Sequence, residues 1–73
     1  MKYCLVGVDG NAYSLMGYTA NALKREGLNE LVNEMFKKAT ASDYSHLIAV
    51  CCEYLDKANE KAIENGWCDD TED

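Results

Sequence analysis

The chain contains no proline, and its N-terminal apolar run, Tyr3 to Val8, is only six residues long. Because proline is the residue that most strongly interrupts helices, its absence favours a helix-rich fold with short connections. An apolar run of this length cannot cross a membrane. The first ten residues also lack the apolar core and the cleavage site of a secretory signal, so we expect a cytoplasmic protein.

Basic residues are few. Seven lysines and arginines oppose thirteen aspartates and glutamates, for a net charge of −6. Nucleic acids and anionic membrane surfaces bind proteins through lysine and arginine, so this balance argues against both as direct partners. It favours solubility or attraction to a basic partner protein. The last five residues, 69–73, are mostly acidic, and we expect them to form a flexible tail.

The cysteines are not arranged as a metal site. None of Cys4, Cys51, Cys52 and Cys68 stands in a CxxC pair, and the adjacent Cys51 and Cys52 cannot both point to one side of a helix. In a reducing cytoplasm we expect buried free thiols that pack as small apolar side chains, with no metal and no cofactor. A metal or redox site at Cys51, Cys52 and Cys68, near His46, is the alternative that remains open.

The residue types of hydrolytic enzymes are present without a catalytic pattern. Asp9, His46 and either Ser14 or Ser45 do not form a nucleophile elbow or a similar motif. The VDGN stretch lacks the glycine spacing of a phosphate-binding loop, and Asp9 would repel a phosphate. We therefore expect a protein that is not an enzyme.

The sequence does contain enough apolar residues, 48%, for the core of one small domain that spans residues 1–73. Residues 2–8 (KYCLVGV) are apolar and β-prone, and they predict one short strand. The Asp-Gly pair that follows is typical of a hairpin turn. The next apolar residues recur every three or four positions, however, so we predict a turn from strand into helix, capped by Asn11 or Asp9.

Two amphipathic helices follow this turn. Apolar residues recur with helical spacing from Ala12, and Gly27 is placed to end the first helix. Within that helix, Gly17 stands where another backbone could approach closely. Residues 28–39 form the second helix, whose apolar side chains occupy one face without a break.

A third helix, residues 44–65, is expected to begin with Ser42 or Thr40 as its cap and to end at Gly66. It would be the longest helix, and its second half would extend beyond what the first two helices can cover. The predicted fold is therefore mainly α, with one short N-terminal β-strand followed by three amphipathic helices.

Two features predict association. A single strand leaves unpaired backbone groups on both edges, which a second copy, an edge of a partner protein or a short strand from residues 67–73 would have to pair. The apolar seam of the long third helix also needs cover. A symmetric homodimer is the commonest solution. We expect its interface to include Tyr3, Leu5, Ala58, Ala62, Ile63 and Trp67.

The run DGNAYSLMG, a helix that ends in KREG, and the run ATASDYSHLI follow one another within residues 5–55. This arrangement resembles a group of very small, acidic bacterial proteins that look like products of phages, plasmids and other mobile elements. These proteins share a DGNAxxxxG start and an ATxxDYxHL entry to the third helix. The resemblance implies a mobile-element origin and carries no particular activity.

Mobile elements often encode short acidic proteins that block host defence by occupying a nucleic-acid-binding surface. Such a protein needs carboxylates spaced like phosphates on a rigid helix. Glu30 and Glu34 would lie about 6 Å apart along the second helix, and Glu26 could extend their row. A second row on the third helix, Glu53, Asp56, Glu60 and Glu64, is interrupted by Lys57 and Lys61.

The sequence therefore predicts a non-enzymatic protein-binding module that inhibits a basic, nucleic-acid-binding host protein. Homo-oligomerisation, or a role as an accessory structural subunit, is the alternative. The expected partner contacts are Glu26, Glu30, Glu34, Asp69, Asp70, Glu72 and Asp73.

Overall fold

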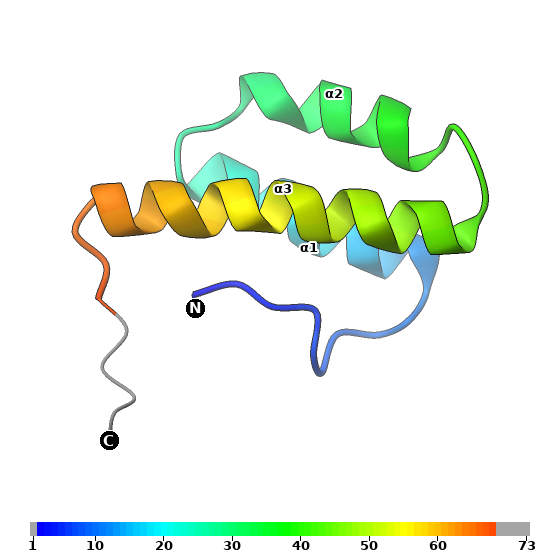
Figure 1. Ribbon diagram of the computed structural model, residues 1–73, viewed down its shortest axis with the longest axis horizontal. Coiled ribbons are helices and arrows are strands. Elements are labelled where there is room, and N and C mark those ends of the chain that lie inside the picture. Colours follow the sequence, from blue (N-terminus) through cyan, green and yellow to red (C-terminus); the bar gives the residue numbers. More distant parts are fainter. Residues whose placement is uncertain (1, 69–73) are drawn as a thin grey trace.

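Three helices make up the regular structure of residues 2–68, the part of the chain that the computed structural model describes (Figure 1). They are α1 (Ala12–Arg25), α2 (Glu30–Ala39) and α3 (Tyr44–Glu64), and each packs against the other two. The prediction of a mainly α fold whose third helix is the longest is confirmed. Across the described residues, no helix has the length and apolar character that crossing a bilayer requires.

The Asp9-Gly10-Asn11 turn leads into a helix, as predicted. The Asn11 side chain accepts a hydrogen bond from the Tyr13 N–H at 2.8 Å, so Asn11 is the cap of α1. Asp9 supports the turn by accepting from the Asn11 N–H at 3.2 Å. Gly27 has a φ of 78°, a left-handed conformation that glycine adopts without strain, and it ends α1 where the sequence predicts.

The cap of α3 is Asp43, and the prediction of Ser42 or Thr40 is wrong. The Asp43 carboxylate accepts from the His46 N–H at 3.0 Å, three residues into the helix. The Thr40 hydroxyl instead donates to the Phe36 carbonyl at 2.8 Å, so Thr40 belongs to the end of α2.

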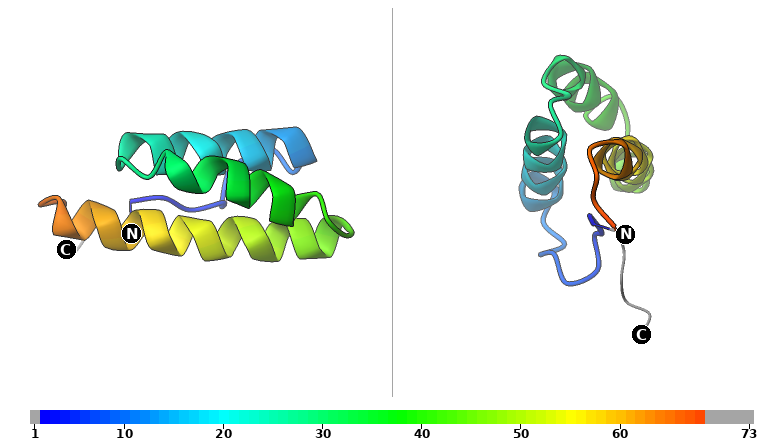
Figure 2. Two further views of the ribbon diagram at one scale, coloured as in Figure 1. Left: turned by 90° about the horizontal axis from the view of Figure 1, so that it is seen from above. Right: turned by 90° about the vertical axis from the view of Figure 1, so that its left-hand side faces the viewer.

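The second half of α3 is covered within the chain. Ala58 and Ala62 are fully buried, and the Asn65 side chain, just after α3, donates to Glu26, just after α1. The end of α3 does project beyond α1 and α2, as expected (Figure 2), but Ala58 and Ala62 are covered within the chain, so they need no cover from a partner. The largest fully buried side chains of the core are Tyr54, Leu23, Met35, Thr19 and Cys51.

Residues 2–8, called the N-terminal segment below, do not form the predicted strand. The Val8 N–H donates to the Leu5 carbonyl at 3.0 Å and Gly7 has a φ of 86°, so the chain turns where a strand would continue. In the end-on view of Figure 2 the segment lies beside α1 and α3 on the side away from α2. Side chains of α1 and α3 bind its backbone, so an unpaired strand no longer argues for association.

Gly17 does not serve a close approach within the chain. A Cβ atom at this position would meet no heavy atom within 4 Å outside its own helix. Within residues 2–68 no backbone packs against Gly17, so close approach within the chain is not seen, and close approach by a partner stays a prediction.

Candidate partner-binding surface

A buried carboxylate, Glu26, joins three separate parts of the chain. Only 4% of this residue is exposed. The Tyr3 hydroxyl donates to its Oε2 at 2.5 Å, and the Lys2 ammonium lies 2.9 Å from the same oxygen. The Asn65 amide donates to Oε1 at 3.1 Å. These contacts fix the N-terminal segment to the ends of α1 and α3.

The same contacts keep Glu26 ionised although it is buried. The Tyr3 hydroxyl and the Lys2 ammonium lower the pKa of Glu26 to about 2, against the opposing effect of burial. Burial, followed by the hydrogen bond to Glu26, raises the pKa of Tyr3. Because this carboxylate faces the interior and is fully engaged, Glu26 cannot extend an exposed acidic row, contrary to the sequence prediction.

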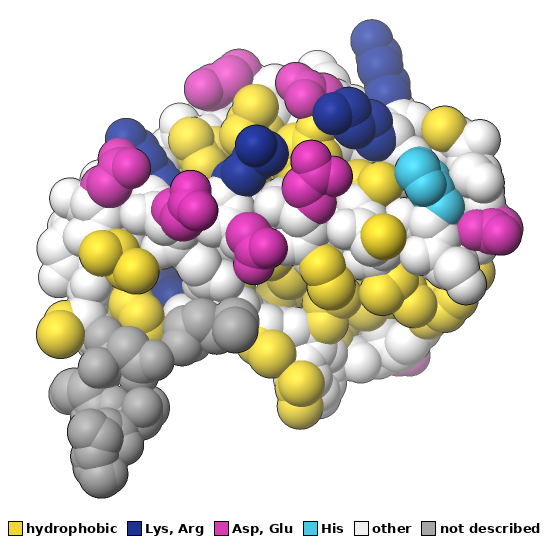
Figure 3. Space-filling model, in the orientation of Figure 1, with side chains coloured by type: hydrophobic (Ala, Val, Ile, Leu, Met, Phe, Trp, Pro, Cys, Tyr) yellow, Lys and Arg dark blue, Asp and Glu magenta, His cyan; other side chains and the backbone are white. Residues whose placement is uncertain are grey.

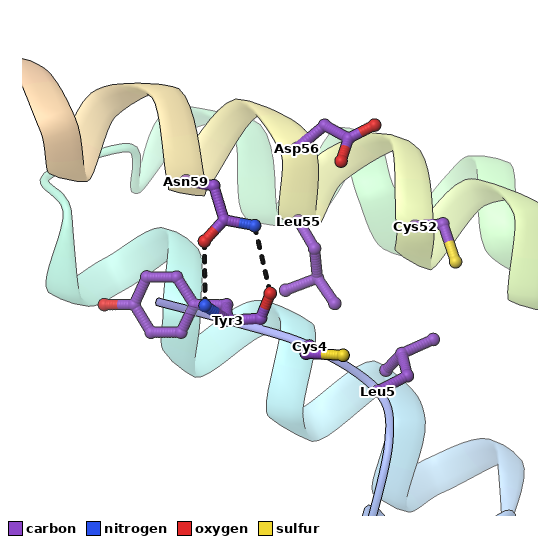
Figure 4. A pocket seen from close by; sticks show the side chains of 7 residues that line it. All are labelled: Tyr3, Cys4, Leu5, Cys52, Leu55, Asp56 and Asn59. Atoms are coloured by element: carbon purple, nitrogen blue, oxygen red, sulfur yellow. Dashed lines mark hydrogen bonds between the residues drawn. The ribbon is translucent and has the colours of Figure 1, made fainter. Parts of the chain in front are cut away.

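The backbone of the N-terminal segment is bound by side chains of two helices. The Asn59 Oδ1 accepts from the Tyr3 N–H at 2.7 Å, and the Asn59 Nδ2 donates to the Tyr3 carbonyl at 3.0 Å. The Cys4 N–H donates to the Tyr18 hydroxyl at 3.1 Å. Figure 4 shows both Asn59 hydrogen bonds reaching from α3 to the backbone of Tyr3.

Beside these bonds lies a hollow of about 160 Å³ between the N-terminal segment and α3. Its walls are mainly apolar, and the segment does not fill it (Figure 4). The residues that line it are Tyr3, Cys4, Leu5, Cys52, Leu55, Asp56 and Asn59.

Exposed carboxylates follow one face of α3. This acidic row consists of Glu53, Asp56, Glu60 and Glu64, all of them exposed. In the space-filling view, acidic side chains are spread along the face of α3 turned to the viewer (Figure 3). Within residues 2–68, Glu64 of this row has an ion pair, with Lys61 at 3.7 Å, and the other three have none.

The two lysines that interrupt the row in sequence neutralise it only in part. Lys61 pairs with Glu64 at the end of the row. Lys57 is exposed and lies next to Glu53 on the helix surface, four residues further on, and its ammonium is 5.9 Å from the centre of the Tyr54 ring. Within residues 2–68 it forms no ion pair with a member of the row.

The row predicted on α2 is weaker than expected. Glu30 is exposed, but the Glu34 carboxylate accepts from the Tyr54 hydroxyl at 2.6 Å and lies 3.4 Å from the Lys38 ammonium. The Tyr54 hydrogen bond lowers the pKa of Glu34. With Glu26 buried and Glu34 engaged, Glu30 is the one of the three predicted glutamates whose carboxylate has no ion pair or hydrogen bond within residues 2–68.

The tail acids, Asp69, Asp70, Glu72 and Asp73, lie outside the described residues. Their share of the charge is nevertheless large: residues 2–68 contain nine acids against seven bases, whereas residues 69–73 contain four acids and no base. Most of the net charge of −6 therefore belongs to the tail.

Half of the predicted dimer interface lies inside the bundle. Tyr3, Ala58 and Ala62 are buried, and Leu5 and Trp67 are partly buried against the core. Ile63 alone is a strongly exposed apolar member of that set, at 62%. Two other apolar residues, Val6 at 88% and Tyr13 at 83%, are more exposed, and the sequence analysis did not single them out.

The cysteines and His46 have no shared site. Cys51 is buried, and burial raises the pKa of its thiol, whereas Cys4, Cys52 and Cys68 are exposed. The expectation of buried thiols thus holds for Cys51 alone. Across residues 2–68 no three metal-ligating side chains come together. The His46 ring contacts the Lys38 carbonyl at 2.9 Å, which ties α3 to the end of α2.

Comparison of the chain with protein-family models, with curated proteins and with solved structures found no match. The two features of the chain that bear on function are therefore the acidic row of α3 and the contacts of Asn59, Tyr18 and Glu26 with the N-terminal segment.

Proposed function

We propose that this chain is a non-enzymatic protein-binding module whose acidic row on α3 contacts a basic surface of a nucleic-acid-binding protein. The observation that carries the proposal is the placement of four exposed carboxylates, three or four residues apart, on one face of a 21-residue helix. At 1.5 Å per residue, neighbours in the row lie about 4.5 to 6 Å apart along the helix axis. Neighbouring phosphates of one DNA strand have a similar separation.

Rigidity makes this row a better candidate than a flexible acidic segment. The opposite face of α3 is buried along its whole length, from Leu47 to Ala62. A surface that is already ordered loses little conformational entropy on binding. The carboxylates thus form a fixed pattern of charge that a phosphate-binding surface can accept.

The resemblance to small mobile-element proteins supports a more specific version of the proposal. In this version the protein acts in the cytoplasm of a bacterium and inhibits a host protein by covering its nucleic-acid-binding surface. A phage or another mobile element would encode it. The acidic tail would add long-range attraction, which speeds the encounter with a basic partner.

The test is a pull-down with the tagged, full-length protein from a nuclease-treated bacterial lysate, at low and at high salt. We expect one basic nucleic-acid-binding protein to be recovered at low salt and lost at high salt. Added back to that purified partner, the protein should release a labelled DNA or RNA duplex from it.

Two variants with equal charge separate the row from the tail. The row variant carries Glu53→Gln, Asp56→Asn, Glu60→Gln and Glu64→Gln. The tail variant neutralises the four acids of residues 69–73 in the same way, so each loses four negative charges. We expect only the row variant to lose the partner. If the row variant still binds the partner, the proposal is contradicted. If both variants lose the partner to the same extent, binding depends on net charge alone.

Self-association is the second candidate, and one observation favours it. Ile63 is 62% exposed near the end of α3, close in sequence to the partly buried Trp67. Covering this side chain with a second copy would stabilise the complex through the apolar area removed from water. A homodimer through this end of the bundle would make the chain an oligomerisation unit or an accessory structural subunit.

A further inference from the structure

We infer that the surface of α1 and α3 that holds the N-terminal segment, called the groove below, is a binding site for an extended segment of a partner protein in which a lysine precedes a tyrosine. The groove is defined by Asn59, Tyr18 and Glu26, which bind the segment, and by the hollow beside it. In the free protein the N-terminal segment occupies this groove as an internal ligand. The inference deepens the proposed function and rests on it only for the basic character of the partner. Three observations support it. Side chains of the helices bind the backbone of the segment, Glu26 binds the Lys2 ammonium and the Tyr3 hydroxyl, and a hollow beside the segment stays unfilled.

The groove binds main-chain atoms as a neighbouring β-strand would. Asn59 accepts from the N–H of Tyr3 and donates to the carbonyl of the same residue, at 2.7 and 3.0 Å. Tyr18 of α1 accepts from the next N–H, that of Cys4, at 3.1 Å. Because these bonds involve only backbone atoms of the segment, they would be the same for any extended chain in this place.

Glu26, at one end of the groove, would determine which segments can bind there. Its Oε2 accepts from the Tyr3 hydroxyl at 2.5 Å and lies 2.9 Å from the Lys2 ammonium. A buried carboxylate needs such partners, because leaving it unpaired is costly. Any occupant that replaces the segment must therefore supply a cation and a hydroxyl in these positions, which defines the Lys-Tyr pattern.

The internal ligand does not fill its site. The hollow of about 160 Å³ lies beside Cys4 and Leu5 and is lined on the other side by Cys52 and Leu55. The hollow is partly open to solvent, and its volume is close to the roughly 150 Å³ of a cavity that holds a benzene ring. An occupant with an aromatic side chain at the position of Cys4 or Leu5 would fill this space.

The segment is joined to α1 by a turn that makes few contacts with the helices. Between Leu5 and Gly10, one backbone hydrogen bond closes the turn, Gly7 has a φ of 86°, and Val6 is 88% exposed. Beyond this turn the chain is anchored, since the Tyr44 hydroxyl donates to the Gly10 carbonyl. Release would therefore stop at Gly10 and leave the three helices in place.

An internal ligand lowers the apparent affinity for an external one by the fraction of time for which the groove is open. The first test uses a fluorescent, capped peptide of sequence Lys-Tyr-Ser-Leu-Val-Gly, which copies residues 2–7 with serine in place of Cys4. Binding to the full-length protein is followed by anisotropy. We expect the Tyr3→Ala protein to bind this peptide at least about tenfold more tightly than the wild type does.

Matched changes test each contact. Adding Asn59→Ala to the Tyr3→Ala protein should abolish binding. A peptide with phenylalanine for tyrosine, or glutamate for lysine, should bind more weakly, and one with phenylalanine for serine should bind more tightly. The inference is overturned if the wild-type and Tyr3→Ala proteins bind the peptide with equal affinity. It is also overturned if adding Asn59→Ala leaves the affinity for the peptide unchanged.

A second measurement applies to the unaltered protein, should Tyr3→Ala fail to fold. Displacement of the segment exposes its backbone, so the peptide should accelerate hydrogen exchange of the Tyr3 amide in the wild type, while core amides of α3 stay protected. Unchanged exchange at the highest peptide concentration overturns the inference. Asp56 lines the hollow, so the control here is a row variant with Asp56 unchanged, which carries Glu53→Gln, Glu60→Gln and Glu64→Gln. This variant should still bind the peptide, so failure of the proposed function and failure of this inference give different results.

Discussion

At the scale of single residues, Glu26 is the buried carboxylate that holds the Lys2 and Tyr3 side chains of the N-terminal segment. Its pKa lies at about 2 in the folded protein instead of 4.5. A carboxyl group whose pKa is lowered by folding stabilises the folded state fully above its ordinary pKa, and this contribution is lost as the pH falls toward the folded value. The pH window of the effect is therefore between 4.5 and about 2.

We predict that Glu26→Gln lowers the free energy of unfolding at neutral pH by about 1 to 3 kcal/mol. The difference between wild type and variant should shrink as the pH falls through this window. Urea unfolding at neutral pH and at several acidic pH values measures it. The matched control is Glu34→Gln, because that carboxylate is 50% exposed and its interactions are screened by solvent. Equal effects of the two changes at all pH values would contradict the assignment.

At the scale of helices, the cap of α3 distinguishes the structure from the sequence prediction. We predict that Asp43→Ala lowers the free energy of unfolding by about 1 kcal/mol, because the His46 N–H loses its acceptor. In a domain of this size, that loss lowers the melting temperature by about 4 to 8 °C. Ser42→Ala is the control and should have almost no effect. The reverse order in thermal unfolding would restore Ser42 as the cap.

The helices could be predicted from the sequence because their determinants are local. Apolar residues every three or four positions, the Asn11 cap and Gly27 all act within one or two turns of chain. The predicted caps of α3, Ser42 and Thr40, lie one and three residues before the observed cap, Asp43. Serine, threonine and aspartate are all good caps, so the choice depends on where the helix begins.

The N-terminal segment and Glu26 could not be predicted in this way. Tyr3 and Asn59 are 56 residues apart, and Tyr3 and Glu26 are 23 apart. An apolar, β-prone run predicts an extended backbone, but nothing local indicates that a helix side chain will bind it. Likewise, the spacing of Glu26, Glu30 and Glu34 suggested one exposed row, while tertiary contacts bury the first and engage the third.

At the scale of the whole molecule, the question is whether the three-helix bundle works as a monomer or associates with a second copy. The predicted interface included Ala58 and Ile63, and their environments are opposite: Ala58 is fully buried and Ile63 is 62% exposed. A charge at these two positions therefore has different consequences. Only at Ile63 can it test an interface without destroying the fold that presents it.

We predict that Ala58→Asp unfolds the protein, because an unpaired carboxylate in a close-packed core cannot be accommodated. Ile63→Asp should keep the helical circular dichroism and change the free energy of unfolding by less than about 0.5 kcal/mol. If self-association uses this end of α3, sedimentation velocity should show a dimer for the wild type and a monomer for Ile63→Asp. A wild type that sediments as a monomer at every concentration removes the second candidate function, and the acidic row and the groove then remain as the working surfaces of a monomer.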